Sequence, residues 1–312
     1  MPGYVKLDDY VDVHASMYTG GFIAEGGSVV RAILGEPKLR ERARVALQKD
    51  AEEKKFAYAR IDSGETKIQQ LQDVFFAVSQ RINWAGAVRR WVRRVLSERF
   101  AIDEGDLTLN GILRADSRES FIVRRQIEEL ISERLLRRTG LSGEFRRAIY
   151  HLIWSVLEPQ SVRSDATPHV IAWLQGRLDR ISLVKTASIY RKITKTNARQ
   201  MLTSLSRWLR DCGYSGLVVT VDLGAIMTLP KFAIGHRYTR AALIDVYEVL
   251  RQFIDAIDEV EGLVLLVMAD EAFADDEVRG TVIYRALRMR LSDDVWDARR
   301  ANALAPMVRI SA

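Results

Sequence analysis

Residues 20–28 read Gly-Gly-Phe-Ile-Ala-Glu-Gly-Gly-Ser, and the interpretation of the rest of the chain depends on them. Counted from Gly21, the stretch fits the phosphate-loop pattern G-x-x-x-x-G-K-[ST] except that Gly27 stands in the lysine position. In such loops glycine N–H groups surround phosphate oxygens, the lysine adds positive charge, and the hydroxyl binds Mg²⁺. The alternative is a plain glycine-rich turn before a helix. The candidate nucleotide-binding residues are Gly21, Glu25, Gly26, Gly27 and Ser28.

The segments on either side of this stretch predict the strand–loop–helix order that a phosphate loop requires. Residues 10–16 alternate loosely between apolar and polar side chains, which favours a short strand. Residues 28–34 indicate the first turns of a helix that begins near Ser28. Arg31 would then lie one turn beyond the loop, either as an ordinary surface residue or as a substitute for the missing lysine.

Five short segments predict strands, and helical segments separate them. The predicted strands are residues 10–16, 56–61, 217–222, 263–268 and 307–310. This alternation implies a parallel sheet with right-handed crossovers. We therefore predict an α/β fold with a parallel five-stranded sheet, in which the glycine-rich loop follows the first strand and Asp222 closes the third. In additional-strand P-loop ATPases these are the places of the Walker A and Walker B motifs.

Asp222 is the candidate Walker B acid because it ends the apolar run 217–222, which is typical of a strand buried on both faces. Ser28 and Asp222 are therefore the predicted Mg²⁺ ligands. The second carboxylate, which would orient an attacking water molecule, is missing because Leu223 follows Asp222. A core strand that ends in a capping aspartate explains the run equally well. The pair Asp270-Glu271, after the run 263–268, is a rival Walker B candidate.

Residues 65–212 predict a large all-helical insertion into a single P-loop-like domain, 1–312, whose core is 1–64 and 213–312. One helix of this insertion, within residues 84–100, has apolar residues on one face and arginines on the other. The arginines are Arg89, Arg90, Arg93 and Arg94. Such a basic stripe would suit a nucleic-acid backbone, but arginines on the wet face of a helix are more often solvated or paired with acids.

The composition is that of a globular protein, with 312 residues, 48% hydrophobic residues and 28% charged residues. The formal net charge of +6, from 47 Lys+Arg against 41 Asp+Glu, is compatible with an acidic or nucleic-acid partner. Cys212 is the single cysteine, which excludes an internal disulfide. The sequence contains no long apolar run and no secretory signal, so we expect a cytoplasmic protein without a membrane partner.

Several segments of the chain resemble the ATP-binding proteins of bacterial BREX phage-resistance systems. The resemblance is carried by residues 172–176 (Ala-Trp-Leu-Gln-Gly), 197–199, 213–219, 247–255, 279–280 and 284–291. It implies an AAA-like P-loop fold, ATP with Mg²⁺ as the cofactor, and a role in a multi-protein anti-phage complex. The chain departs from the family pattern where the chemistry would lie, because Gly27 replaces the Walker A lysine and Leu223 replaces the second Walker B acid.

These departures favour a degenerate P-loop subunit that acts as a structural or regulatory partner, with weak or no ATP hydrolysis. One alternative is an active AAA-like ATPase that a partner subunit completes. A second is a DNA-binding module on a P-loop scaffold. The expected partners are other defence-system proteins, DNA, and further subunits in a homo- or hetero-oligomer. Candidate intersubunit arginine fingers, which would otherwise be ordinary helix arginines, are Arg285, Arg288 and Arg290.

Overall fold

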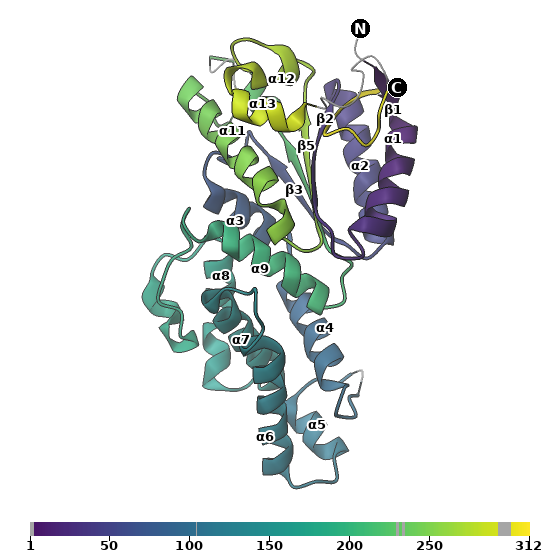
Figure 1. The fold of residues 1–312 in the computed structure, drawn as a ribbon. Coiled ribbons are helices and arrows are strands. Elements are labelled where there is room, and N and C mark those ends of the chain that lie inside the picture. The colour runs from purple at the N-terminus through teal and green to yellow at the C-terminus, as the bar shows by residue number, and fades with distance from the viewer. Residues whose placement is uncertain (1–2, 104, 229–230, 233–234, 293–300) are drawn as a thin grey trace. The chain divides into compact units, whose positions relative to one another are not determined.

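A computed structural model describes residues 3–103, 105–228, 231–232, 235–292 and 301–312 of the chain. The chain forms two compact units (Figure 1). The first, here called the sheet unit, comprises residues 1–81 and 214–312, and the second, the helical unit, comprises residues 82–213. Each unit has its own buried core, and we describe them separately.

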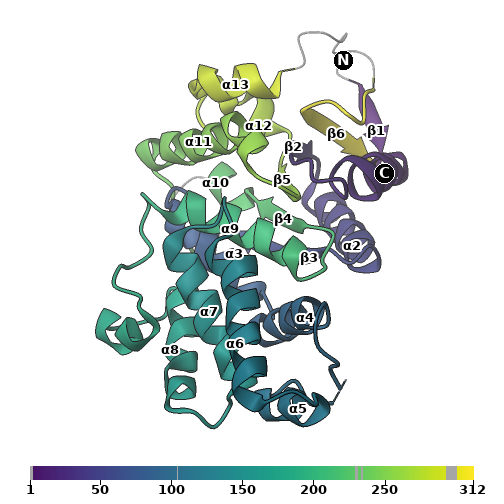
Figure 2. The ribbon, with the colours of Figure 1, turned by 60° about the horizontal axis from the view of Figure 1, so that its bottom comes forward.

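The sheet unit contains six parallel strands in the order β1-β6-β2-β5-β4-β3, which can be followed across Figure 2. The strands are β1 (Tyr4–Lys6), β2 (Val29–Leu34), β3 (Ala57–Asp62), β4 (Leu217–Asp222), β5 (Leu263–Ala269) and β6 (Met307–Ser311). Strands β4 and β5 are almost entirely buried, as their continuous apolar sequences require of strands covered on both faces. The α/β class and the parallel sheet are therefore confirmed.

Two of the predicted elements are wrong. Residues 10–16 belong to helix α1 (Leu7–Val13) and a π-helical turn, η1 (His14–Phe22), and not to a strand. Tyr10, His14 and Tyr18 are all buried, so the buried side chains recur every four residues, which is the spacing of a helix and not of a strand. Residues 29–34 form strand β2 and not a helix, because they pair with β5 on one side and with β6 on the other, and all of them except the half-buried Arg31 are buried. With edge strand β1 included, the described sheet has six strands and not five.

Helices cover both faces of this sheet. Helices α1 and α2 (Pro37–Glu53) share a buried core with Ile33, Val218 and Leu266 of the strands. On the other side of the strands lie α11 (Arg240–Asp255) and α13 (Arg285–Leu291) (Figure 1). The remaining helical segments of the sheet unit are α3 (Leu71–Arg81), α10 (Gly224–Met227), η5 (Ile257–Glu259), α12 (Ala272–Asp275) and η6 (Thr281–Ile283).

The helical unit has no strand among its described residues. Its elements are α4 (Trp84–Leu96), α5 (Leu109–Ala115), α6 (Ser120–Ile131), η2 (Ser132–Leu136), α7 (Gly143–Leu157), η3 (Val162–Ala166), α8 (Thr167–Leu174), η4 (Ile181–Ala187) and α9 (Ala198–Asp211). Trp84 stacks on Trp208 with ring centroids 5.8 Å apart, and Phe145 packs edge-on against Trp208 at 6.0 Å. Helix α3, which the predicted boundaries assign to the insertion, packs against β3 within the sheet unit. No helix in the described part of the chain is long and apolar enough to cross a membrane.

Candidate functional site

The glycine-rich stretch precedes β2 and so lies at the amino end of the parallel sheet. Its first residues belong to the π-helical turn η1, and hydrogen-bonded turns follow from residue 23 to residue 27. The backbone N–H groups of residues 25, 26 and 27 donate to the carbonyl oxygens of residues 21–23 at 2.9–3.1 Å. These N–H groups are satisfied within the turn, whereas a phosphate cradle needs them directed at the anion. The predicted strand–loop–helix context of Gly21, Glu25, Gly26 and Gly27 is therefore wrong.

Ser28 joins the starts of two neighbouring strands. Its hydroxyl donates to the carbonyl oxygen of Val260 at 2.6 Å and accepts from the backbone N–H of Leu263 at 2.9 Å. Asp222, by contrast, ends β4 at the level of Ile33, five residues beyond Ser28 along the sheet. At ~3.3 Å per residue the two positions are separated by about 17 Å along the strands. Ser28 and Asp222 therefore do not form one Mg²⁺ site in this structure.

Arg31 lies within strand β2 and not on a helix after the loop. Its Nε donates to the hydroxyl of Tyr18 at 3.0 Å, and its guanidinium lies 5.3 Å from the centroid of the same ring. These contacts tie β2 to the π-helical turn η1. The guanidinium is thus engaged by Tyr18, and Arg31 is level with Thr220 in the middle of β4, two residues before Asp222.

In parallel α/β sheets, ligands bind outside the carboxyl ends of the strands. In this chain β2 ends at Leu34 and helix α2 begins at Pro37, so only Gly35 and Glu36 join them. Pro37 has no N–H, and the N–H of Leu39 is bonded to the carbonyl oxygen of Glu36 at 3.0 Å. This connection is far shorter than a phosphate loop and offers few free N–H groups to an anion.

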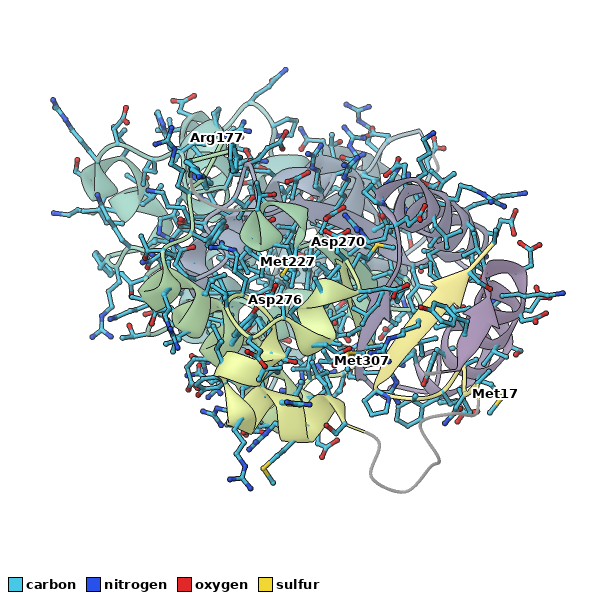
Figure 3. All side chains as sticks on the ribbon, turned by 90° about the horizontal axis from the view of Figure 1, so that it is seen from above. Met17, Arg177, Met227, Asp270, Asp276 and Met307 are labelled. Atoms are coloured by element: carbon cyan, nitrogen blue, oxygen red, sulfur yellow. The ribbon has the colours of Figure 1, made fainter. Side chains whose placement is uncertain are left out.

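Arg40, on the first turns of α2, occupies the space outside the ends of β2, β4 and β5. Its Nη1 donates to the carbonyl oxygen of Gly35 at 2.8 Å and to the carboxylate of Asp270. Its Nη2 lies 3.6 Å from Oδ1 of Asp222. The Arg40 side chain is only 5% exposed, whereas those of Asp222 and Asp270 are 30% and 37% exposed. We call these three side chains the Arg40 cluster (Asp270 is labelled in Figure 3).

The surroundings of Asp222 oppose its ionisation in part. Burial raises its pKa, and the neighbouring carboxylate of Asp62 acts in the same direction. The backbone N–H of Gly224, 2.7 Å from Oδ1, and the guanidinium of Arg40 lower the pKa of the same carboxyl. A side chain at Gly224 would meet Arg40 Nη2 at 3.3 Å, so the glycine leaves room for the guanidinium. Arg40 therefore stabilises a carboxylate that burial alone would favour in its neutral form.

The residues at this edge do not fit a nucleotide triphosphate with Mg²⁺. With both carboxylates ionised, the Arg40 cluster carries one positive and two negative charges, a net charge of −1, which repels a further anion. Arg40 also contacts both carboxylates, so a metal ion bound by Asp222 and Asp270 would share them with the guanidinium. Within the described ranges, no group of three or more His, Cys, Asp or Glu side chains is placed to hold a metal ion.

The rival Walker B pair, Asp270-Glu271, is divided between two contacts. Asp270 is bound by Arg40, as described above. Glu271 accepts a hydrogen bond at 2.8 Å from the hydroxyl of Tyr4 at the edge of the sheet. Leu223, which follows Asp222, is fully buried and cannot orient a water molecule. No carboxylate therefore directly follows Asp222 in the chain, and the acid beside it among the described residues is Asp62, at the end of the neighbouring strand β3.

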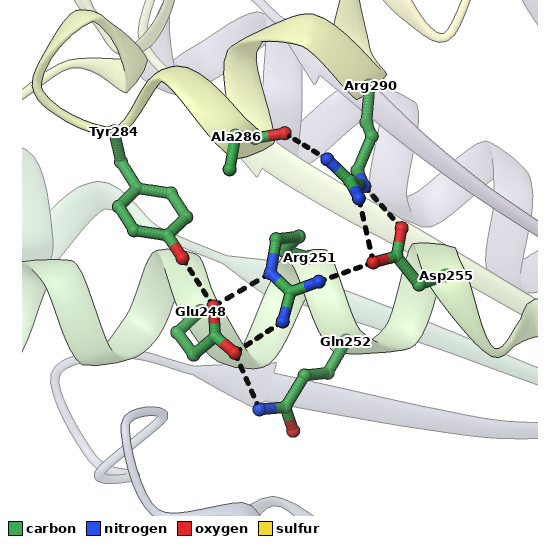
Figure 4. A network of polar contacts seen from close by, with 7 residues as sticks. All are labelled: Glu248, Arg251, Gln252, Asp255, Tyr284, Ala286 and Arg290. Carbon is green, nitrogen blue, oxygen red and sulfur yellow. Dashed lines mark hydrogen bonds and ion pairs between the residues drawn. The ribbon is translucent and has the colours of Figure 1, made fainter.

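The other predicted arginines have different surroundings. Arg290 donates to both carboxylate oxygens of Asp255, within a network that joins α11 and α13 (Figure 4). Arg285 and Arg288 are exposed. In the helical unit all four arginines of the α4 stripe (Arg89, Arg90, Arg93 and Arg94) are exposed. Arg290 is therefore engaged within the chain, and so are Arg90 and Arg93, although these two are also exposed.

Arg40 is not among the residues predicted from the sequence, although the sequence contains a sign of it. Arg40 lies on the same face of α2 as Ala43, Leu47 and Ala51, all fully buried, at helical spacings of three or four residues. An arginine on the apolar face of a helix needs a buried partner, because an isolated buried charge is costly. That position could have been recognised, but its partners could not.

Comparison with known proteins adds one finding to this geometry. The family model described as "BREX system ATP-binding protein BrxC/D" matches residues 21–312. No curated protein and no solved structure matches the chain. The matched range includes the whole Arg40 cluster and the entire helical unit.

Proposed function

Because this chain belongs to the BREX system ATP-binding protein BrxC/D family, we propose that it is a degenerate, P-loop-derived subunit of a BREX phage-resistance system. It acts as a structural or regulatory partner in the cytoplasm and hydrolyses ATP weakly or not at all. Its partners are other proteins of the defence system, in a homo- or hetero-oligomer. The resemblance of its sequence to this family is confirmed, whereas the loss of catalysis is our inference from the site.

The observation that carries this proposal is the Arg40 cluster. Arg40 places a buried guanidinium between Asp222 and Asp270, where a working ATPase would hold Mg²⁺ and the terminal phosphates. An intramolecular cation in that position offsets part of the negative charge of the two acids without a nucleotide. The short connection from β2 to α2 supports the same conclusion, because it lacks both the lysine and the row of N–H groups that bind phosphate.

The strand order supports descent from an additional-strand P-loop protein, with the phosphate loop at residues 35–36 and not at residues 20–28. One strand, β5, lies between β2 and β4, and Asp222 ends β4. In the additional-strand arrangement one strand lies between the strand before the phosphate loop and the strand that carries the Walker B acid. Strand β2 therefore takes the first of these places. The sequence match at residues 20–28 is then a coincidence of composition.

Titration of the full chain with fluorescently labelled ATP, with and without Mg²⁺, tests the proposal. We expect no saturable binding at micromolar protein and no steady release of phosphate. Saturable micromolar binding accompanied by steady phosphate release overturns it. If binding is observed, Arg40→Met and Asp222→Asn locate it, since a nucleotide bound at the carboxyl edge must respond to both changes, whereas one bound elsewhere must not.

The family description favours a second candidate, in which ATP binds and a partner subunit supplies the missing groups. In that case Arg40 would have to leave the two carboxylates when the partner docks. Phosphate release would then depend on adding the other proteins of the system, and it would be lost in Asp222→Asn. Release that is the same with and without Asp222 would exclude a catalytic role for this chain.

A further inference from the structure

The connection between α8 and α9 in the helical unit carries a positive charge equal to the whole excess positive charge of the protein. Residues 177–199, here called the basic segment, contain seven Lys or Arg residues, from Arg177 to Arg199, and a single acid, Asp179. Its net charge is therefore +6, the same as the net charge of the whole chain. Outside the basic segment the positive and negative charges cancel.

The basic segment is held in a defined conformation on the helical unit. Its apolar residues Val184, Ile189 and Ile193 are buried, and η4 packs against α8 and η3. The indole N–H of Trp173 donates to the carbonyl oxygen of Arg191 at 2.9 Å. These contacts hold the backbone of the basic segment against the helical unit, so its charged side chains project from an ordered surface. Arg177, the first residue of the segment, is labelled in Figure 3.

The side chains that this segment exposes are of the types that contact phosphate. All seven basic residues are exposed, as are the hydroxyl residues Ser182, Thr186 and Ser188. Tyr190 is 63% exposed and offers a ring for stacking. Lys, Arg, Ser, Thr and Tyr side chains make most protein contacts to nucleic-acid backbones. Val184, Ile189 and Ile193 are buried, and Leu183, which is 41% exposed, adds little apolar area, so the segment is poorly suited to inserting into a membrane.

The charges of the basic segment are also free of internal ion pairs. Across the part of the chain that the structure describes, no ion pair involves any of its seven basic side chains. Elsewhere in the same unit, arginines are paired, as in Arg124 with Glu158 at 2.8 Å and Arg138 with Asp211 at 3.3 Å. Unpaired cations can displace the counterions condensed on a polyanion without first breaking an internal contact.

We propose that the basic segment binds the phosphodiester backbone of a nucleic acid. The α4 stripe, from Arg89 to Arg94, is the weaker candidate, because Arg90 and Arg93 already interact within the protein. The contact is to phosphates and is therefore insensitive to base sequence. It does not depend on the nucleotide chemistry of the sheet unit, so it stands whether or not the chain binds ATP.

Fluorescence anisotropy with labelled duplex DNA, duplex RNA and single-stranded DNA measures this binding in the full chain. Each phosphate contact on a duplex contributes about −0.9 to the slope of log K against log salt concentration. Five contacts would give a slope of about −4.5 and a loss of affinity of roughly 500-fold between 50 and 200 mM salt. The three probes distinguish the sources of the phosphodiester, and vesicles of an anionic phospholipid test the membrane alternative.

Two triple variants with equal loss of charge separate the two surfaces. Arg180→Ala/Lys185→Ala/Lys192→Ala should weaken binding to all probes that the unmodified chain binds and reduce the duplex slope by about 2.7. Arg89→Ala/Arg93→Ala/Arg94→Ala should leave the slope unchanged. Unaltered melting temperatures, expected for exposed side chains, show that both variants are folded.

Three outcomes would overturn the proposal. The first is the absence of binding to any nucleic-acid probe at 50 mM salt. The second is an equal loss in both triple variants, which would indicate a diffuse effect of net charge. The third is binding to the vesicles with none to nucleic acid, which would assign the basic segment to a lipid surface.

Discussion

Replacing Arg40 by methionine tests directly whether this guanidinium holds the carboxyl edge of the sheet together. Methionine preserves the unbranched stem and its packing, but it leaves Asp222 and Asp270 without their cation. Removal of one partner from a fully buried ion pair costs about 3–5 kcal/mol. Because the two aspartates are 30% and 37% exposed, solvent screens part of that loss, and we expect about 1–3 kcal/mol.

The loss should depend on pH, with a sign set by the pKa of Asp222. Burial raises that pKa above the value of the unfolded chain, and Arg40 opposes the rise. A carboxyl whose pKa is raised on folding binds more protons in the folded state, so its stabilising contribution is present below the unfolded pKa and is lost as pH rises. Without Arg40 the pKa of Asp222 rises further. The deficit of Arg40→Met should therefore be larger at pH 8 than at pH 5.

Hydrogen exchange of the full chain, read in β4 and β5, is the suitable assay. Tryptophan fluorescence is not, because five of the six tryptophans lie in the helical unit. Arg42→Met is the matched control, since Arg42 is exposed on the same helix and should change stability by less than about 0.5 kcal/mol. Equal losses in the two variants, or a deficit in Arg40→Met that grows toward acid pH, would refute the assigned role of Arg40.

Three further changes test other parts of the interpretation. Ser28→Ala removes the two hydrogen bonds of this hydroxyl, to Val260 and Leu263, and should cost about 1–2 kcal/mol in urea unfolding. Ser16→Ala, which removes an exposed hydroxyl, is the near-neutral control. Gly27→Lys should confer no affinity for labelled ATP, because residue 27 lies at the amino end of the sheet. The hydrogen bonds from Arg251 lower the pKa of Glu248 to about 2. The ionised carboxylate therefore contributes stability at pH values above its unfolded pKa, and this contribution is lost as the pH falls. Glu248→Gln should cost ~0.5 kcal/mol at pH 7 and nothing near pH 2.

Much of the fold could be predicted from local patterns. The apolar runs at 217–222 and 263–268 are rich in β-branched residues and bounded by turn residues such as Gly216 and Gly262, which favours strands buried on both faces. The helical unit could be recognised because its apolar residues recur at helical spacing around buried tryptophans such as Trp208. Both patterns show which side chains of a single helix or strand are buried, and this can be predicted from the sequence of that element alone.

The error at residues 10–34 arose where local pattern could not decide. A six-residue apolar run such as 29–34 suits a buried strand and the start of a buried helix equally. The glycine motif at 20–28 favoured the helix, and the helix in turn made the motif look like a phosphate loop. The predicted helix and the predicted phosphate loop each supported the other, although both rested on the same few residues. The pairing of β2 with both β5 and β6 is a long-range fact that settles the choice.

The Arg40 cluster could not be predicted for a different reason, since it depends on topology. Residues 40, 222 and 270 are far apart in sequence, and they meet only because β2, β4 and β5 run parallel and end at the same edge. Once that edge is known, the cluster constrains function more strongly than any motif. Two carboxylates near one another at a sheet edge need a cation, and a working ATPase supplies Mg²⁺ with its substrate. A chain that supplies its own cation, on a helix anchored by Ala43 and Leu47, keeps the edge folded without a nucleotide. Such an edge can keep its folded structure after nucleotide hydrolysis has been lost. The nucleotide titration tests that loss, and the Arg40→Met variant tests whether the guanidinium stabilises the edge instead.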